Sequence, residues 1–189
     1  MIEKKHKRLE LLDLPAEYSN LDQTLNSAFK ILEDASKNRR SLFHTPTLST
    51  FDGNRVSIRT MVLREFDPDK RLIRFHTDYR SIKIQQLKKD SHGAVHGYDP
   101  SLKIQIRLDG KINLHHKDEI TKGSWELSKD MSKECYFVGG PPGSKIDDPT
   151  EYEPSTFNLK TFNGFDNFCV IVFEIESMEF LYLKKSGHR

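Results

Sequence analysis

The sequence predicts a mainly β fold of the α+β class, an antiparallel β-barrel decorated by helices. Short segments that alternate apolar and polar residues follow one another at hairpin spacing, and helical periodicity occurs only between them. The length of 189 residues is enough to bury one sizeable core. We therefore expect one domain over residues 1–189, with an N-terminal helix at about 20–37 and the barrel at about 45–184.

The first expected element is a helix. Ser19 or Asn20 can cap its N-terminus, and the polar run at 38–40 ends it. Apolar residues recur between these limits at spacings of four and three, which predicts one buried stripe. The stripe consists of Leu21, Leu25, Phe29 and Leu32.

The period then changes to that of strands. Residues 47–51 and 56–66 are predicted to form two strands joined by a hairpin at Asp52-Gly53-Asn54. A turn at 67–70 leads to a third strand at 71–77. A short helix is expected from Ser81 to Lys89. Its expected inward residues are Ile82 and Leu87, with Ile84 or Gln86 as further candidates.

The second half is predicted to add four strands and more helix. Strands are expected at 93–98 and 102–108, and at 168–174 and 178–184 around a tight turn at 175–177. Asp109-Gly110 fits either a two-residue hairpin or a glycine bulge inside a longer strand, and we favour the bulge. The remaining expectations are helix over 118–133, a loop at 139–144 and an irregular segment at 152–164.

Composition excludes several classes of protein. The 30 basic and 28 acidic residues leave a net charge of +2, which argues against a nucleic-acid-coating protein. The longest apolar run, residues 168–173, is too short to cross a membrane, and no secretory signal is visible. Cys135 and Cys169 cannot supply a thiolate zinc site. These features predict a reducing compartment, the cytoplasm or alternatively the nucleus.

Two motifs that suggest a ligand site are weak evidence for one. The run 139–145 suggests a phosphate loop, but Ser144 stands where that pattern requires glycine, and two prolines remove backbone donors. His92 and His96 fall on a predicted strand, where residues four apart are separated by about 13 Å. We therefore expect neither a nucleotide loop nor a metal site from these residues.

Arg59 is the first informative residue. Strand alternation places it between Ser57 and Met61, on a face that becomes apolar further along. A half-buried guanidinium there requires an anionic partner. An acidic residue on the neighbouring strand would also satisfy it, and the strand pattern alone favours that simpler reading.

The segment 75–83 strengthens the case for a bound anion. It runs from a strand end through a polar turn into a helix N-terminus, where Ser81 is a natural cap. Arg80 and Lys83 lie beside the first free amides of the helix. Cations at this end interact unfavourably with the helix dipole, but together with the amides they can bind a phosphate. An ordinary solvated first turn is the alternative.

Further along, Gln105 faces away from the core, toward either solvent or a polar heterocycle.

Together these segments resemble the pyridoxamine-phosphate-oxidase-like family of FMN-binding split barrels. Arg59-Thr60-Met61-Val62-Leu63-Arg64 resembles the family's strand motif, and Phe75-His76-Thr77 followed by Arg80-Ser81-x-Lys83 resembles its phosphate motif. Gln105, followed by Gly110, matches the family's flavin-contacting glutamine and glycine. The order and spacing agree over about residues 45–114.

The resemblance implies that the protein binds FMN. The residues implied to hold its phosphate are Arg59, Thr77, Arg80, Ser81 and Lys83. Those implied to lie around its ring are Thr60, Met61, Val62, Arg64 and His76. Gln105 is implied to reach the ring from the second subunit of a homodimer.

The substrate segments depart from the family pattern. Arg64 replaces the oxidase's lysine, Ile82 a second basic residue, and Leu181 a tryptophan. The substrate run is not recognisable at 128–137, nor is the C-terminal Arg-x-His-x-Arg pattern, which leaves Arg189 as the one candidate substrate residue there. We therefore expect an FMN-dependent oxidoreductase with a different small-molecule substrate and no assignable general base. The alternatives are a non-catalytic flavin carrier, sensor or scaffold, and a module that binds an acidic partner.

Overall fold

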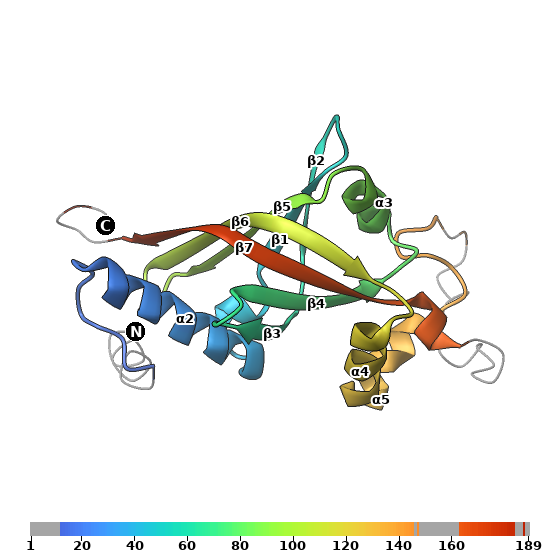
Figure 1. Ribbon diagram of the computed structural model, residues 1–189, viewed down its shortest axis with the longest axis horizontal. Coiled ribbons are helices and arrows are strands. Elements are labelled where there is room, and N and C mark those ends of the chain that lie inside the picture. The colour runs from blue at the N-terminus through green and yellow to red at the C-terminus, as the bar shows by residue number, and fades with distance from the viewer. Residues whose placement is uncertain (1–11, 146, 148–162, 184–186, 188–189) are drawn as a thin grey trace.

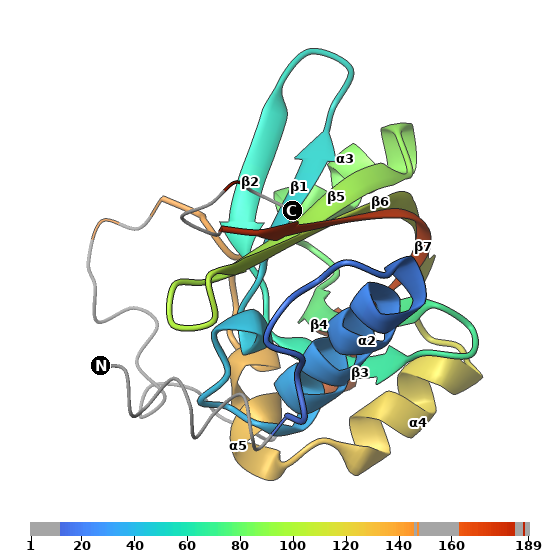
Figure 2. The same ribbon diagram turned by 90° about the vertical axis from the view of Figure 1, so that its left-hand side faces the viewer.

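The computed structural model describes residues 12–145, 147, 163–183 and 187. Seven strands form one antiparallel sheet in the order β2-β1-β5-β6-β7-β4-β3. The sheet curls around helix α2 without closing, so the predicted split barrel is confirmed as an open one (Figures 1 and 2). The strands are β1 (Thr47–Phe51), β2 (Val56–Thr60), β3 (Leu63–Asp67), β4 (Leu72–Asp78), β5 (His92–Asp99), β6 (Ile104–His115) and β7 (Phe168–Tyr182).

Helices pack inside the curl and at one end of the sheet. The α-helices are α2 (Leu21–Lys37), α3 (Ile82–Lys89), α4 (Glu119–Leu127) and α5 (Asp130–Lys133). The described residues also form short 3-10 turns at η1 (Leu42–His44), η2 (Glu134–Tyr136) and η5 (Gly164–Asn167). No helix in the described part of the chain is long and apolar enough to span a membrane.

Helix α2 begins and ends where the sequence predicts, but its buried face is rotated. The Asn20 side chain accepts a hydrogen bond from the Gln23 amide at 3.0 Å and caps the helix. Leu21 is 88% exposed and Leu25 36% exposed, so the predicted stripe is wrong over the first turns. The small Ala28 and Ala35 let the helix approach the sheet closely. The buried residues are Ser27, Ala28, Ile31, Leu32 and Ala35.

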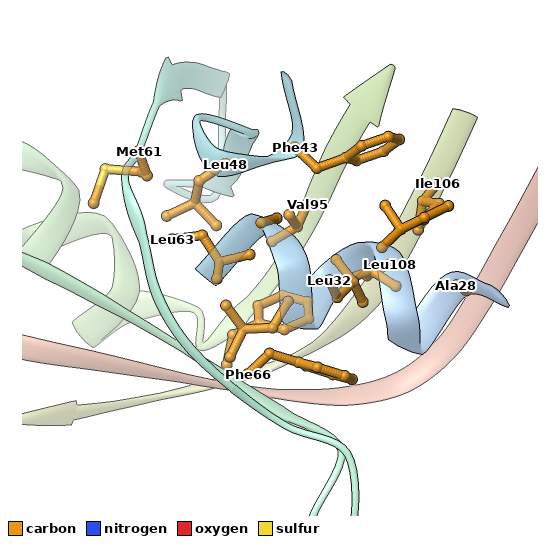
Figure 3. Packing of buried hydrophobic residues seen from close by; sticks show 14 of the residues in the cluster. Ala28, Leu32, Phe43, Leu48, Met61, Leu63, Phe66, Val95, Ile106 and Leu108 are labelled. Carbon is orange, nitrogen blue, oxygen red and sulfur yellow. The ribbon is translucent and has the colours of Figure 1, made fainter. Parts of the chain in front are cut away.

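The predicted strand 56–66 is in fact two strands at opposite edges of the sheet. β2 pairs with β1, whereas β3 pairs with β4, and Met61 and Val62 connect them. Inward alternation holds as far as Leu63, because both Met61 and Leu63 point into the core that the sheet encloses (Figure 3). An irregularity between Leu63 and Glu65 then shifts the register, so Phe66 instead of Glu65 is buried.

The two long strands β6 and β7 confirm one expectation and correct another. The register shifts at Asp109 and Gly110, so the bulge is confirmed and β6 continues beyond it. The tight turn predicted at 175–177 is wrong, because β7 is one continuous strand. The extra residue of the bulge lies in β7: Ile175 pairs with Gly110 and Ser177 with Asp109, so Glu176 has no pairing partner in β6, whereas Asp109 and Gly110 pair with β5 without interruption.

Two helical expectations also need correction. Ile82 is 67% exposed and was wrongly predicted to point inward, while Ile84, Gln86 and Leu87 are buried as expected. The helix predicted over 118–133 is interrupted at Ser128 and Lys129 and becomes α4 and α5. The irregular segment expected at 152–164 lies almost entirely outside the described residues.

The core joins α2 to the concave face of the sheet. Side chains from α2, α3, η1 and six strands meet there, and Figure 3 shows part of this cluster. Its central members include Leu32, Phe43, Leu48, Leu63, Phe66, Val95, Ile106 and Leu108. A smaller cluster under α4 and η2 contains Tyr136, Phe168, Val170 and Val172, with Trp125 packed against it. This second cluster anchors the helices that lie beside the end of β4.

Candidate functional site

Three elements bring the predicted phosphate residues together. Arg59 comes from β2, Thr77 from the end of β4, and Ser81 and Lys83 from the start of α3, which packs beside the β1–β2 hairpin (Figure 1). Lys83 Nζ donates to Thr77 Oγ1 at 2.9 Å and to Ser81 Oγ at 3.1 Å. The Arg59 guanidinium is near enough to lower the pKa of the Lys83 amine. We call Arg59, Thr77, Ser81 and Lys83 the cradle.

The charges of the cradle are uncompensated by carboxylates in direct contact. Within the described part of the chain, neither Arg59 nor Lys83 forms an ion pair; both donate to neutral oxygens. Burial is the main cause that lowers the pKa of Lys83, Arg59 adds to it, and Asp78 opposes it. Two half-buried cations in contact with neutral groups favour an anion between them. The donor set therefore fits the terminal phosphate of FMN.

Arg80 is occupied by a different partner. Its Nε and Nη2 donate to the two carboxylate oxygens of Asp78, at 3.0 and 2.6 Å. Asp78 is 6% exposed, and its backbone oxygen also accepts from Ser81 Oγ at 2.7 Å. The structure thus uses Arg80 to neutralise a buried carboxylate and hold the turn. Sequence reasoning missed Asp78, although its i, i+2 spacing from Arg80 was a visible signal.

Thr60, the last residue of β2, and the two residues that connect β2 to β3 differ in what they expose. The Thr60 side chain is exposed and that of Val62 half-buried, so both are accessible near the cradle strand. Met61 is 7% exposed and packs in the core beside Leu48 and Leu63 (Figure 3). Its side chain is therefore part of the core, and only its backbone is left for contact with a ligand.

Arg64 and His76 line a cavity of about 490 Å³ between the β3–β4 edge and the helices α4 and α5. Arg39, Arg74 and Lys129 add further cations, while Arg74 pairs with Glu65 at 2.8 Å. Burial lowers the pKa of His76 to about 4, with Arg64 and Arg74 as further causes. His76 is therefore a neutral imidazole at neutral pH. Its strand neighbour Thr77 belongs to the cradle, so β4 connects the cavity to the cradle.

The neutral state of His76 predicts a pH dependence of stability. Because its pKa is near 4 when folded and 6.5 when unfolded, stability is full above about pH 6.5 and is lost as pH falls toward 4. We expect about 2–3 kcal/mol of this loss to come from His76. Urea unfolding of apoprotein at pH 7.5 and pH 5 measures it. His76→Phe should reduce the loss, whereas the exposed control His92→Phe should not; equal behaviour of the two variants contradicts the assignment.

Gln105 lies away from the cradle of its own chain. Arg59 pairs with Leu48 on the inner face of the sheet, whereas Gln105 alternates with the buried Ile104 and Ile106 and faces outward. Its Oε1 lies 3.2 Å from His96 Nε2. One chain alone therefore does not bring Gln105 to Arg59. Arg189, the predicted substrate residue, lies outside the described residues.

Two further polar residues complete the surroundings of Arg59. Thr50 Oγ1 accepts from Arg59 Nη1 at 2.7 Å, and Gln86 Oε1 accepts from Nη2 at 3.0 Å. Thr50 lies nine and Gln86 27 positions from Arg59, and the sequence predicted neither contact. No group of three or more metal-ligating side chains occurs among the residues described.

Known proteins share this architecture and these segments. A protein-family model for the pyridoxamine 5'-phosphate oxidase FMN-binding domain matches residues 24–116, which include the whole cradle and Gln105. The chain is 26% identical over 140 residues to pyridoxine/pyridoxamine 5'-phosphate oxidase 2 of Arabidopsis thaliana, covering 69% of this chain and 68% of that protein.

Solved structures agree on the fold. A pyridoxamine 5'-phosphate oxidase-related, FMN-binding protein from Nostoc punctiforme superposes with a TM-score of 0.67 at 20% identity, over 85% of this chain and 86% of its own. PhzG from Burkholderia lata, in complex with tetrahydrophenazine-1-carboxylic acid, superposes with a TM-score of 0.65 at 19% identity, over 94% and 86%. At these identities the likeness extends to the fold and not to the substrate.

Proposed function

Residues 24–116 of this chain are an FMN-binding domain of the pyridoxamine 5'-phosphate oxidase family, and on that premise we propose that the protein is an FMN-dependent oxidoreductase of a small molecule. The observation that carries the proposal is the adjacency of two features on β4. Thr77 belongs to the cradle and His76 to the cavity of about 490 Å³. Successive residues of a strand point to opposite faces, so β4 carries the phosphate site and the cavity on its two faces, one residue apart along the strand.

Each group of residues has a separate task in this proposal. FMN, when bound, would accept a hydride from the substrate. Arg59 and Lys83 hold the phosphate by charge-assisted hydrogen bonds, and Thr77 and Ser81 orient the Lys83 amine. Arg64 lines the cavity with a fixed positive charge, and His76 offers a neutral imidazole to a substrate. The helices α4 and α5 form the far wall of the cavity.

We extend the proposal to a homodimer that shares the flavin sites. The outward face of β2, β1 and β5 exposes Phe51, Val56, Ile58 and Tyr98, which is a large apolar area for the surface of a monomer. Gln105 lies on that same outward face of the sheet. Because β2 is an edge strand, a symmetric pairing through this face and around that edge would place Gln105 of one copy toward the cradle of the other.

A charge on this face is expected to separate the copies. Ile58 is 71% exposed, so Ile58→Glu costs the monomer's fold little but puts two charges into the dimer interface. Light scattering should show a monomer with weakened FMN binding. Met131→Glu, at an equally exposed residue of α5, should stay dimeric and keep its flavin. A wild-type monomer that retains FMN at micromolar concentration would refute the shared site.

The oxidoreductase proposal is tested by reduction of the bound flavin. The purified protein is expected to be yellow and to release FMN, identified by mass, on denaturation. Candidate donors, pyridoxamine 5'-phosphate among them, are then added without oxygen and flavin bleaching is followed. We expect pyridoxamine 5'-phosphate to be a poor donor, because residues 128–137 lack the oxidase's substrate run. Flavin that no donor reduces would instead support a carrier.

A further inference from the structure

Gln86 is a buried amide that holds the guanidinium of the cradle. It is 6% exposed, on the face of α3 that packs against the sheet. Its Oε1 accepts from Arg59 Nη2 at 3.0 Å and from the Thr50 hydroxyl at 2.7 Å, and its Nε2 donates to Ser57 Oγ at 2.9 Å. These partners fix which end of the amide faces Arg59, because only the oxygen can accept from the guanidinium.

Thr50 completes a closed set of contacts. It is 1% exposed, and its hydroxyl accepts from Arg59 Nη1 at 2.7 Å while donating to Gln86. Both terminal nitrogens of Arg59 are therefore held, one from β1 and one from α3. This leaves the guanidinium little rotational freedom, so little entropy remains to be lost when it binds an anion.

The chemical type of these acceptors matters as much as their positions. A carboxylate at residue 86 would make the same two contacts, but it would neutralise Arg59 and repel an incoming phosphate. The chain uses an amide and a hydroxyl, which orient Arg59 and leave its charge uncompensated. Burial alone lowers the pKa of Arg59, which is consistent with a desolvated guanidinium that lacks a bonded anion.

We propose that Gln86 is a positioning residue that orients Arg59 without neutralising it, and so determines the preference of the site for a phosphorylated flavin over riboflavin. This inference rests on the proposed placement of the FMN phosphate at the cradle. A purely structural role, attachment of α3 to the β1–β2 hairpin, is the competing explanation. If Gln86 positions Arg59, replacing its amide by a carboxylate of the same shape should weaken FMN binding selectively. If it only attaches α3, the same replacement should leave the preference for FMN unchanged.

The test is the pair of dissociation constants for FMN and riboflavin of apoprotein carrying Gln86→Glu. The new carboxylate can accept from Arg59, Thr50 and Ser57, so the attachment of α3 is kept. We expect the dissociation constant for FMN to rise at least about tenfold and that for riboflavin to stay within about twofold. Gln85→Glu is the matched control, because Gln85 is exposed on the same helix. There both constants should stay within about twofold.

A second variant covers the case in which Gln86→Glu does not fold. Thr50→Val removes the other contact to Arg59 at constant shape and should also weaken FMN selectively. Equal losses for both flavins, or an unchanged preference for FMN in both variants, overturn the inference. Arg59→Ala is measured alongside. If it also leaves the preference for FMN unchanged, the placement of the phosphate at the cradle is wrong. If it abolishes that preference, the placement holds and only the inference about Gln86 fails.

Discussion

Replacing Arg59 or Lys83 by alanine is expected to weaken FMN binding by about ten- to a hundred-fold. Each change removes a charge-assisted hydrogen bond to phosphate, worth about 1.5–3 kcal/mol, and about 1.4 kcal/mol corresponds to tenfold in the dissociation constant. Riboflavin lacks the phosphate, so its affinity should hardly change. Titration of the apoprotein, followed by quenching of flavin fluorescence, measures both.

The two variants should differ in stability. Lys83→Ala removes a cation from the N-terminal turn of α3 and should leave the fold intact or slightly more stable. Arg59→Ala also removes the contacts to Thr50 and Gln86 and should cost about 1 kcal/mol. Lys89→Ala and Arg55→Ala are controls, because both residues are exposed nearby. Equal weakening of FMN and riboflavin by the cradle variants would show general damage rather than loss of a phosphate contact.

Gly110→Ala is expected to destabilise the protein by at least about 3 kcal/mol. A β-carbon on Gly110 would overlap the backbone carbonyl oxygen of Glu174 in the centre of the sheet, where β6 and β7 pair through the bulge. A backbone atom cannot move aside as a side chain can, so the strands must separate locally. Chemical denaturation of the apoprotein measures the loss in free energy of unfolding.

Gly123→Ala is the matched control for this substitution. Gly123 lies within α4, and a β-carbon there meets no atom within 4 Å. The change should stabilise the helix by up to about 1 kcal/mol, because alanine is the better helix former. If Gly110→Ala unfolds at the same denaturant concentration as wild type, the bulge does not impose glycine.

The parts of this fold that the sequence predicts are those set by local chemistry. The helix α2, the turn into α3 and the bulge at Gly110 all follow from caps, turn residues and short periodicity. The break at Met61 does not, because inward alternation continues through it to Leu63 and only the pairing partner changes. Likewise Glu174, Glu176 and Ser177 have turn-like polarity but lie in a continuous strand, stabilised by pairing with β6.

The candidate site also contains some contacts that the local sequence predicts and others that it does not. Thr77, Ser81 and Lys83 lie within one short segment, so their convergence was predictable from a strand end followed by a helix cap. Thr50 and Gln86 contact each other across 36 positions of the chain, and no local pattern signals such a contact. The ion pair between Asp78 and Arg80 is local, but whether Arg80 turns to the carboxylate or to an external anion is decided only by the folded turn.

The claim that this chain holds FMN by its phosphate is tested most directly by titrating wild-type apoprotein with FMN, FAD and riboflavin under one salt condition. The cradle offers cations for a terminal monophosphate, with Arg80 already neutralised by Asp78. FMN should therefore bind at least about tenfold more tightly than either other flavin, and this advantage over riboflavin should vanish when Arg59 and Lys83 are both alanine. Equal affinity of the wild-type protein for FMN and riboflavin, or no uptake of any flavin, would contradict it.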